Sequence, residues 1–254
     1  MKNNLNYALL KFILSLIILL PFFSIYCLEE IEVLYDERMI PWTYKDSNSK
    51  LVGSSVETFI EALKGKGYRI KWTNMPYARA KDELQKTSGR NKYIISINRD
   101  SSNEPNFRWI TLIRKTYRGI FSKKYQKEMS IEEIKQTQEK IGIRIGASIY
   151  NELINLGLKD QIEQSISGYT IAKKILNKRI GFWATNSDTS SYDYKAAGGN
   201  FKDLFLVNKF KKDSKFYVVT SKNTEEEKAL RIKKYLDKFI KTQKYNNIID
   251  KYYK

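Results

Sequence analysis

A helix followed directly by a buried strand, within residues 75–109, is the feature that most limits how this chain can fold. Pro76 suits the first turn of a helix, where its missing N–H costs no hydrogen bond, and good helix formers follow it. The run Lys92–Ile97 (KYIISI) is β-branched and aromatic and lies between polar turns, which predicts a strand buried on both faces. Helix then strand indicates an α/β crossover. Ligands of open α/β sheets gather beyond the carboxyl ends of strands, so the loop Asn98–Ser101 is either a binding segment or a solvated turn.

The first 27 residues have the composition of a secretory signal peptide. Two lysines lie among the first eleven residues, and the apolar run Phe12–Tyr26 is short for a membrane span. We expect cleavage after Cys27 and export to the periplasm, with an uncleaved anchor as the alternative. Lipid attachment at Cys27 is disfavoured, because Tyr26 precedes it where a small residue is expected.

Cysteine and histidine are almost absent from the sequence. Cys27 is the only cysteine and there is no histidine, so the mature chain can form no disulfide and lacks the commonest general base and metal ligand. We therefore expect no metal, no cofactor and no cysteine- or histidine-based nucleophile. About 227 residues remain after residues 1–27 are removed, enough for one large domain or two lobes.

The chain is strongly basic, with a net charge of +18 that falls to +16 without the leader, which holds two basic residues and no acids. The positive charge is spread along the whole sequence and is mostly lysine, unlike the clustered patches of nucleic-acid-binding proteins. We therefore expect no nucleic-acid partner. Non-specific attraction to an anionic cell envelope fits the charge better.

Alternating strands and helices are predicted along the rest of the chain. Strands are predicted at Glu30–Tyr35, Tyr68–Trp72, the second half of Ile110–Lys124, Ile141–Gly146, Ile180–Thr185 and Lys215–Thr220. Helices are predicted at Ser54–Gly65 with Ser54 or Ser55 as N-cap, after Gly146, around Ala172–Leu176, and across Thr224–Tyr253, with a capping box of Ser130 and Glu133 opening a surface helix or turn. In the last of these regions, Thr224–Tyr253, apolar residues recur on one side of the predicted helix. This apolar stripe predicts core packing by Ala229, Ile232, Leu236, Phe239 and Ile240.

The order and spacing of several segments resemble the extracellular solute-binding proteins of family 3, the binding components of polar amino-acid ABC transporters. The resemblance runs from about Glu30 to Tyr253, and no single motif in it is specific. Its segments are DERMIPWTYKDSNSKLVGSSVETFIEAL, MPYARAKDEL, NFRW, IGIRIGASIYNEL, RIGFWATN and KFYVVTSKN.

The resemblance implies an α/β fold of the two-lobed periplasmic-binding-protein kind (type II), in which two hinge strands join lobes that close on a ligand. The first lobe would comprise residues 28–118 and 221–254, and the second residues 123–215. The hinge strands would lie near Gly119–Ser122 and Phe216–Thr220.

The sequence departs from the family at the positions that hold an amino acid. Family members grip the ligand carboxylate with an arginine after the central strand, where this chain has Asn103, with Arg99 a few residues earlier. The aspartate that pairs with the ligand ammonium would fall at Thr185 or Asn186, and a second acid of that strand is replaced by Gly181. A neutral amide does not offset a desolvated ammonium as a carboxylate does. We therefore expect a ligand other than an ordinary α-amino acid.

The candidate binding residues combine aromatic faces, cations and strand-end polar groups. They are Tyr35, Trp42, Tyr77, Arg79, Arg99, Ser148, Tyr150 and Asn186. The alternative for the aromatic residues is a place in the core, and for Arg79 the exposed side of its helix. Local capping or pairing is expected for Asp36 and Glu57.

The resemblance implies a monomeric periplasmic protein that delivers a small-molecule solute to the membrane permease of an ABC importer, and that is not an enzyme. Two alternatives stay open. Cyclohexadienyl dehydratases share this lobe pair, and Glu37, Glu57 and Glu152 are the acids such an enzyme could use here. An orphan sensory binding domain is the other alternative, and the sequence does not separate it from a transport protein.

Overall fold

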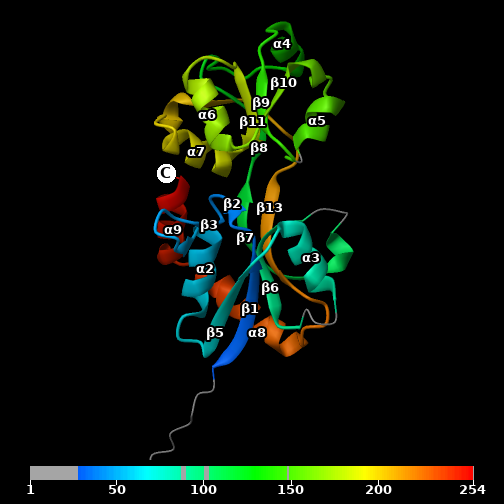
Figure 1. Ribbon diagram of the computed structural model, residues 1–254, viewed down its shortest axis with the longest axis vertical. Coiled ribbons are helices and arrows are strands. Elements are labelled where there is room, and N and C mark those ends of the chain that lie inside the picture. The colour runs from blue at the N-terminus through cyan, green and yellow to red at the C-terminus, as the bar shows by residue number, and fades with distance from the viewer. Residues whose placement is uncertain (1–27, 87–89, 100–102, 148, 254) are drawn as a thin grey trace, which may run out of the picture.

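The computed structural model describes residues 28–86, 90–99, 103–147 and 149–253, and the predicted signal peptide with Cys27 lies outside them. The chain forms two α/β lobes, one above the other, joined by extended strands (Figure 1). Each lobe has its own five-stranded mixed sheet and its own buried core. The predicted two-lobed α/β fold is therefore confirmed. None of the described helices is long and apolar enough to span a membrane.

The first lobe is built on a sheet of strand order β5-β1-β6-β13-β7. These strands are β1 (Glu29–Tyr35), β5 (Tyr68–Asn74), β6 (Lys92–Asn98), β7 (Arg108–Thr116) and β13 (Ser214–Thr220). The helices are α2 (Ser54–Leu63), α3 (Tyr77–Gln85), α8 (Glu226–Phe239) and α9 (Gln243–Tyr253). Strand β1 runs parallel to β5 and β6, whereas β13 runs antiparallel to β6 and β7. Helices α2, α8 and α9 pack on one face of the sheet and α3 on the other.

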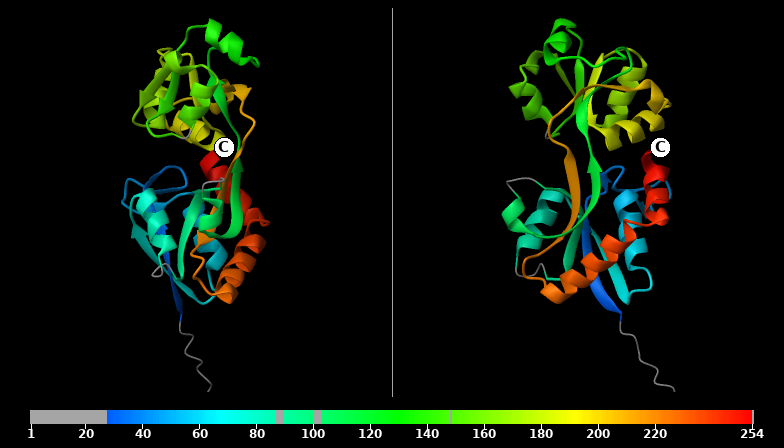
Figure 2. Two further views of the ribbon diagram at one scale, coloured as in Figure 1. Left: turned by 90° about the vertical axis from the view of Figure 1, so that its right-hand side faces the viewer. Right: turned by 180° about the vertical axis from the view of Figure 1, so that it is seen from behind.

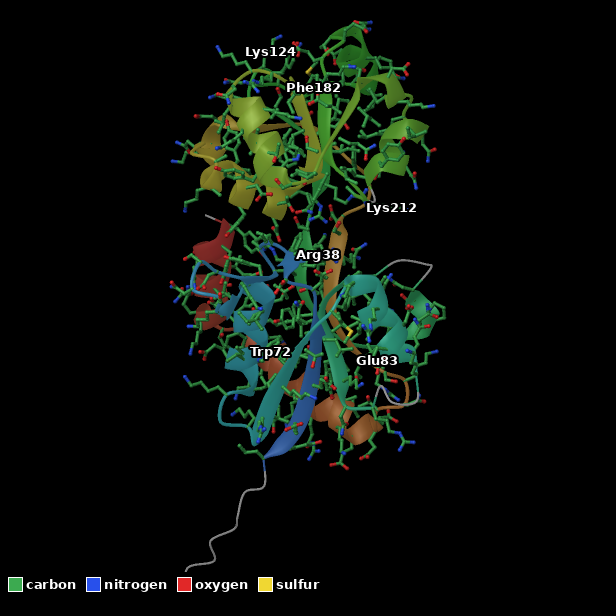
Figure 3. The ribbon with its side chains drawn as sticks, viewed as in Figure 1. Arg38, Trp72, Glu83, Lys124, Phe182 and Lys212 are labelled. Carbon is green, nitrogen blue, oxygen red and sulfur yellow. The ribbon has the colours of Figure 1, made fainter. Side chains whose placement is uncertain are left out.

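A small antiparallel sheet of β2 (Arg38–Met39), β3 (Thr43–Lys45) and β4 (Leu51–Val52) follows β1. It lies at the end of the first lobe that faces the second lobe, where Arg38 is labelled (Figure 3). Asp36, at the end of β1, is buried and fixes this region by accepting hydrogen bonds from Arg38 Nη2 at 2.6 Å and from the Tyr77 backbone N–H at 3.0 Å. The local pairing expected for Asp36 is confirmed.

The second lobe has the strand order β10-β9-β11-β8-β12. The strands are β8 (Arg118–Ser122), β9 (Ile141–Arg144), β10 (Ile162–Ser165), β11 (Phe182–Asn186) and β12 (Phe205–Lys209). The helices are α4 (Ile131–Gln136), α5 (Ile149–Asn155), α6 (Gly168–Leu176) and α7 (Ser187–Ala196), with 3₁₀ turns at Lys159–Gln161 and Phe201–Asp203. A further 3₁₀ turn, Glu104–Asn106, lies between β6 and β7 of the first lobe. Helices α4 and α5 pack on one face of the sheet, and α6 and α7 on the other.

The chain passes between the lobes twice. The first passage runs from β7 to β8 through Tyr117, and the second from β12 to β13 through residues 210–213. Seen from behind, the two passages run side by side (Figure 2). Two segments were expected as hinge strands. Gly119–Ser122 is part of β8, which pairs with β11 in the second-lobe sheet, and Phe216–Thr220 is part of β13, which pairs with β6 in the first-lobe sheet.

Helix ends show where the sequence prediction was accurate and where it was wrong. The capping box of α4 is confirmed, since Ser130 Oγ accepts from the Glu133 N–H at 3.1 Å and Glu133 Oε2 accepts from the Ser130 N–H at 2.7 Å. The predicted caps of α2 are wrong. Gly53 is its N-cap, at a φ of 133° that favours glycine, and Ser54 and Ser55 are buried inside the first turn.

The predicted single helical region at the C-terminus is two helices, α8 and α9. Thr242 serves both, because its hydroxyl donates to the Phe239 carbonyl at 2.7 Å and accepts from the Tyr245 N–H at 3.3 Å. The apolar stripe packs as predicted at Ala229, Ile232, Leu236 and Phe239, all buried in the first-lobe core, while Ile240 is half-buried at the end of α8.

Candidate ligand-binding site

A cavity of about 340 Å³ lies between the lobes and takes its lining from both. The first lobe contributes residues from the β2–β3 region, the start of α3, the end of β6 and the start of β13. The second lobe contributes the start of β8, the end of β9, the first turns of α5 to α7 and the end of β11. These are the strand ends and helix starts at which α/β folds bind ligands.

Aromatic residues form much of the cavity wall. Trp42 is only 5% exposed, and its ring centroid lies 4.8 Å from that of Phe216 on β13. Its backbone is fixed by bonds from the Trp42 N–H to the Met39 carbonyl at 2.8 Å and from the Ser55 N–H to the Trp42 carbonyl at 3.2 Å. Trp183 on β11 and Tyr77 on α3 also line the cavity. These rings give a solute large contact areas at little cost in side-chain entropy.

Asparagines supply hydrogen-bonding groups on both walls. Asn98 Oδ1 accepts from the Lys215 N–H at 3.0 Å, and Asn103 Nδ2 donates to the Asn98 carbonyl at 2.7 Å. Asn186 caps α7 by accepting from the Thr189 N–H at 2.9 Å. The side-chain N–H groups of Asn98 and Asn186 make no hydrogen bond with the described part of the chain, so both can donate to a solute.

Three cationic side chains line the cavity, Lys81 from the first lobe and Arg118 and Arg144 from the second. Lys81 Nζ lies 5.2 Å from the centroid of the Tyr77 ring. Arg118 pairs through Nη2 with Glu152 of α5. Arg144, at the end of β9, is exposed and forms no ion pair within the described residues. No acidic residue is among the described residues that line the cavity.

One acid lies just behind the cavity wall. Asp193 of α7 packs against Gly168, and a Cβ on that glycine would lie 1.9 Å from Asp193 Oδ2. Burial raises the pKa of Asp193 to about 6, and the positive charge of Arg144 opposes that rise. Gly168 lines the cavity, so the carboxylate is one residue removed from it.

Trp42, Tyr77 and Asn186, of the residues predicted for the site, line this cavity. Tyr35 is buried instead, with its ring edge-on to Trp72 at 6.1 Å between centroids. Tyr150 packs against the second-lobe core.

Two predicted arginines lie elsewhere, and Ser148 lies outside the described residues. Arg79 is exposed on α3. Arg99 pairs through two nitrogens with Glu104, and its guanidinium carbon stacks 4.8 Å from the Trp109 ring and 5.3 Å from the Tyr217 ring. Arg99 thus lines a separate depression with Trp109 and Tyr217, and not the interlobe cavity.

The residues that sequence reasoning missed are Lys81, Arg118, Arg144 and Trp183. Arg144 carried a usable signal, because it lies near the end of a predicted strand of the second lobe. No signal marked Lys81 or Arg118, which are two of 46 basic residues in the chain. No cluster of three or more potential metal-ligating acids, histidines or cysteines exists among the described residues.

No family model and no curated protein sequence matches this chain. Solved structures match over most of its length. An ancestral cationic amino acid solute-binding protein (AncCDT-1) has a TM-score of 0.75 at 16% identity, covering 89% of this chain and 96% of that one. The second substrate-binding domain of GlnP from Lactococcus lactis, in an open conformation, has a TM-score of 0.69 at 16% identity, covering 88% and 95%.

A histidine kinase sensor domain with similarity to periplasmic binding proteins also matches, with a TM-score of 0.67 at 15% identity, covering 89% of this chain and 96% of that domain. Identities this low show the fold alone. The chain therefore has the two-lobed periplasmic-binding-protein fold, and the resemblance to amino-acid solute-binding proteins is confirmed at the level of structure.

Proposed function

We propose that this protein is a periplasmic solute-binding protein that closes its lobes on a small polar solute and delivers it to the permease of an ABC importer. The interlobe cavity is the observation on which the proposal depends. Its lining comes from both lobes, so a solute inside it contacts both at once. Such a solute stabilises the closed arrangement over the open one by its differential affinity for the two.

The size and lining of the cavity fit a small polar molecule. Its volume of about 340 Å³ lies at the lower end of the range for small-molecule sites. Trp42 and Trp183 offer apolar contact, and Asn98 and Asn186 offer donors. A solute of amino-acid or small organic-acid size would be enclosed by this lining.

The solute is proposed to differ from an ordinary α-amino acid. Solved relatives of the fold are named as binding arginine, glutamine or histidine. In this chain the positions expected for the carboxylate clamp and the ammonium partner hold Asn103, Thr185 and Asn186, and all three line the cavity. None of them is charged, so a zwitterion would leave its ammonium without a carboxylate partner in the described lining.

Catalysis on this scaffold has less support. One matching structure is named as a precursor of cyclohexadienyl dehydratase. Of the acids considered for such an enzyme, Glu57 is bound by Lys251 at 2.6 Å and Glu37 by Lys45 at 3.3 Å, and neither lines the cavity. Glu152 does not line the cavity either and is paired with Arg118, which does. A sensory role would use the same closure and a different membrane partner.

A thermal-shift screen of residues 28–254 tests the proposal. Amino acids, polyamines, sugars, organic acids and aromatic metabolites are compared, because a solute that binds only the folded chain raises its melting temperature. We expect at least one class to raise it. Tyr77→Ala removes a ring from the cavity and should weaken binding of that solute at least about tenfold. Tyr169→Ala, on the exposed side of α6, should leave it unchanged. No shift with any class at millimolar concentration would contradict the proposal.

A further inference from the structure

Building on the proposed function, we infer that the solute is a small organic anion without an ammonium group, which bridges cationic side chains on the two facing lobes. The first observation is the distribution of charge. Lys81 projects from α3 of the first lobe, and Arg118 and Arg144 lie on β8 and β9 of the second lobe. The described lining contains no acid between them.

The second observation is that these cations keep unused bonding capacity. Lys81 and Arg144 form no ion pair with any described residue, whereas Arg38, Arg99 and Arg114 are each held by a carboxylate through two nitrogens. Arg118 uses Nη2 for Glu152, and a guanidinium has five N–H donors. Donors on all three side chains therefore remain for a carboxylate, sulfonate or phosphate of the solute.

Lobe closure gives this arrangement its selectivity. Closure brings Lys81 toward Arg118 and Arg144 and expels water from the cleft. The repulsion between these positive charges then increases, because less water remains to screen them. An anion between the walls offsets that repulsion and favours the closed state. A cationic solute adds to it and favours the open state.

An α-amino acid fits this cleft less well than the corresponding anion. Its ammonium would need a carboxylate, and the described lining contains none, since Asp193 lies behind Gly168 and Glu152 is paired with Arg118. The corresponding 2-keto acid has a keto group in place of the ammonium, and its carboxylate can still bind Lys81, Arg118 and Arg144. The rings of Trp42, Phe216 and Trp183 favour a flat apolar body on that anion.

Calorimetric titration of residues 28–254 with matched pairs tests the inference directly. Phenylpyruvate is compared with phenylalanine, and 2-oxoglutarate with glutamate, so that each pair differs only in keto group against ammonium. We expect the tightest ligand among these probes and the thermal-shift panel to be an anion without an ammonium, at least tenfold tighter than its amino-acid counterpart. A tightest ligand that is an amino acid, polyamine or sugar would overturn the inference and leave the solute-binding function standing. The absence of any ligand would overturn both.

Variants of the cations provide the second test. Lys81→Met and Arg144→Met should each weaken the best anion at least tenfold and reduce the dependence of its affinity on salt concentration. Arg79→Met is the matched control, since Arg79 lies on α3 two residues from Lys81 but is exposed and outside the lining. It should bind as the unmodified chain does. Melting curves establish that each variant is folded. Unchanged affinity in both Lys81→Met and Arg144→Met would overturn the inference.

Discussion

Arg114 of the first lobe and Asp188 of the second are joined by two hydrogen bonds, from Nε to Oδ2 at 2.9 Å and from Nη2 to Oδ1 at 2.6 Å. Asp188 is 1% exposed, and the guanidinium carbon of Arg114 lies 4.6 Å from the Tyr253 ring. The hydroxyls of Tyr44 and Tyr192 form a further bond between the lobes at 2.9 Å. Helix α7 therefore contacts both the first passage and the C-terminal helix α9, beside which it lies in Figure 1.

Replacing Arg114 by methionine should destabilise the protein strongly. Asp188 would stay buried without its partner, and loss of one member of a buried ion pair costs about 3–5 kcal/mol. Urea unfolding followed by circular dichroism measures this free energy. The double variant Arg114→Met with Asp188→Leu removes both charges and should be more stable than Arg114→Met alone.

Lys115→Met is the control for this pair. Lys115 follows Arg114 in the same strand and forms an ion pair with Asp213 in which the lysine side chain is exposed to solvent. Loss of this pair should lower the free energy of unfolding by less than about 1 kcal/mol. Equal losses of stability in Lys115→Met and Arg114→Met would show that the interlobe pair has no special role.

Most of the fold could be predicted because its signals are local. The run Lys92–Ile97 is a strand, β6, because buried central strands need continuous apolar residues, and its pattern is complete within six positions. The capping box of Ser130 is equally local. The break between α8 and α9 was missed because it depends on hydrogen bonds of Thr242, a residue that also occurs inside helices.

The site was harder to predict because its residues meet only in three dimensions. Arg99 follows a central strand and looked suited to an anion, but Glu104, five residues later, binds it. Arg118 reaches the cavity because β8 lies between β11 and β12, a pairing across more than 60 residues. Aromatic residues such as Trp42 and Tyr77 could be predicted because they lie in loops or at a helix start next to strand ends.

Gly53→Ala should destabilise the first lobe and loosen Trp42. Gly53 has a φ of 133°, and a Cβ there would lie 2.2 Å from the Trp42 carbonyl oxygen, so the backbone of the cavity wall must shift. We expect a loss of more than about 2 kcal/mol in the free energy of unfolding, measured with urea. Gly65 has a φ of 69°, but a Cβ there would meet no atom within 4 Å. Gly65→Ala should therefore lower the free energy of unfolding by only about 1 kcal/mol. A smaller effect at Gly53 than at Gly65 would contradict this account of the close approach.

Tyr252→Phe should weaken the attachment of the C-terminal helix. The Tyr252 hydroxyl accepts from the Gly53 N–H at 3.0 Å and donates to Glu57 Oε1 at 2.5 Å, so its loss leaves a buried N–H without a partner. We expect a loss of about 1–3 kcal/mol in urea unfolding. Tyr169→Phe removes an exposed hydroxyl and should change stability by less than about 0.5 kcal/mol. Equal stability of Tyr252→Phe and the unmodified chain would show that these bonds contribute nothing.

Asp193→Asn should stabilise the protein at alkaline pH and have little effect at acid pH. Burial raises the pKa of Asp193 in the folded chain from 3.8 to about 6, so the folded state holds this proton more tightly than the unfolded state. The ionised carboxylate therefore lowers stability as pH rises from about 4 through about 6, and the loss is complete above that window. The two pKa values differ by the equivalent of about 3 kcal/mol, an upper limit for the gain in Asp193→Asn at pH 8.

Urea unfolding of Asp193→Asn and the unmodified chain at pH 4 and pH 8 measures this difference. Asp203→Asn provides the control, because Asp203 is an exposed acid of the same lobe and its replacement should change stability by less than about 0.5 kcal/mol. A gain in Asp193→Asn that is equal at pH 4 and pH 8 would contradict the raised pKa, because only the ionised carboxylate is destabilising. A gain confined to pH 8 is the expected result for the raised pKa of the half-buried Asp193 carboxylate, which lies behind Gly168.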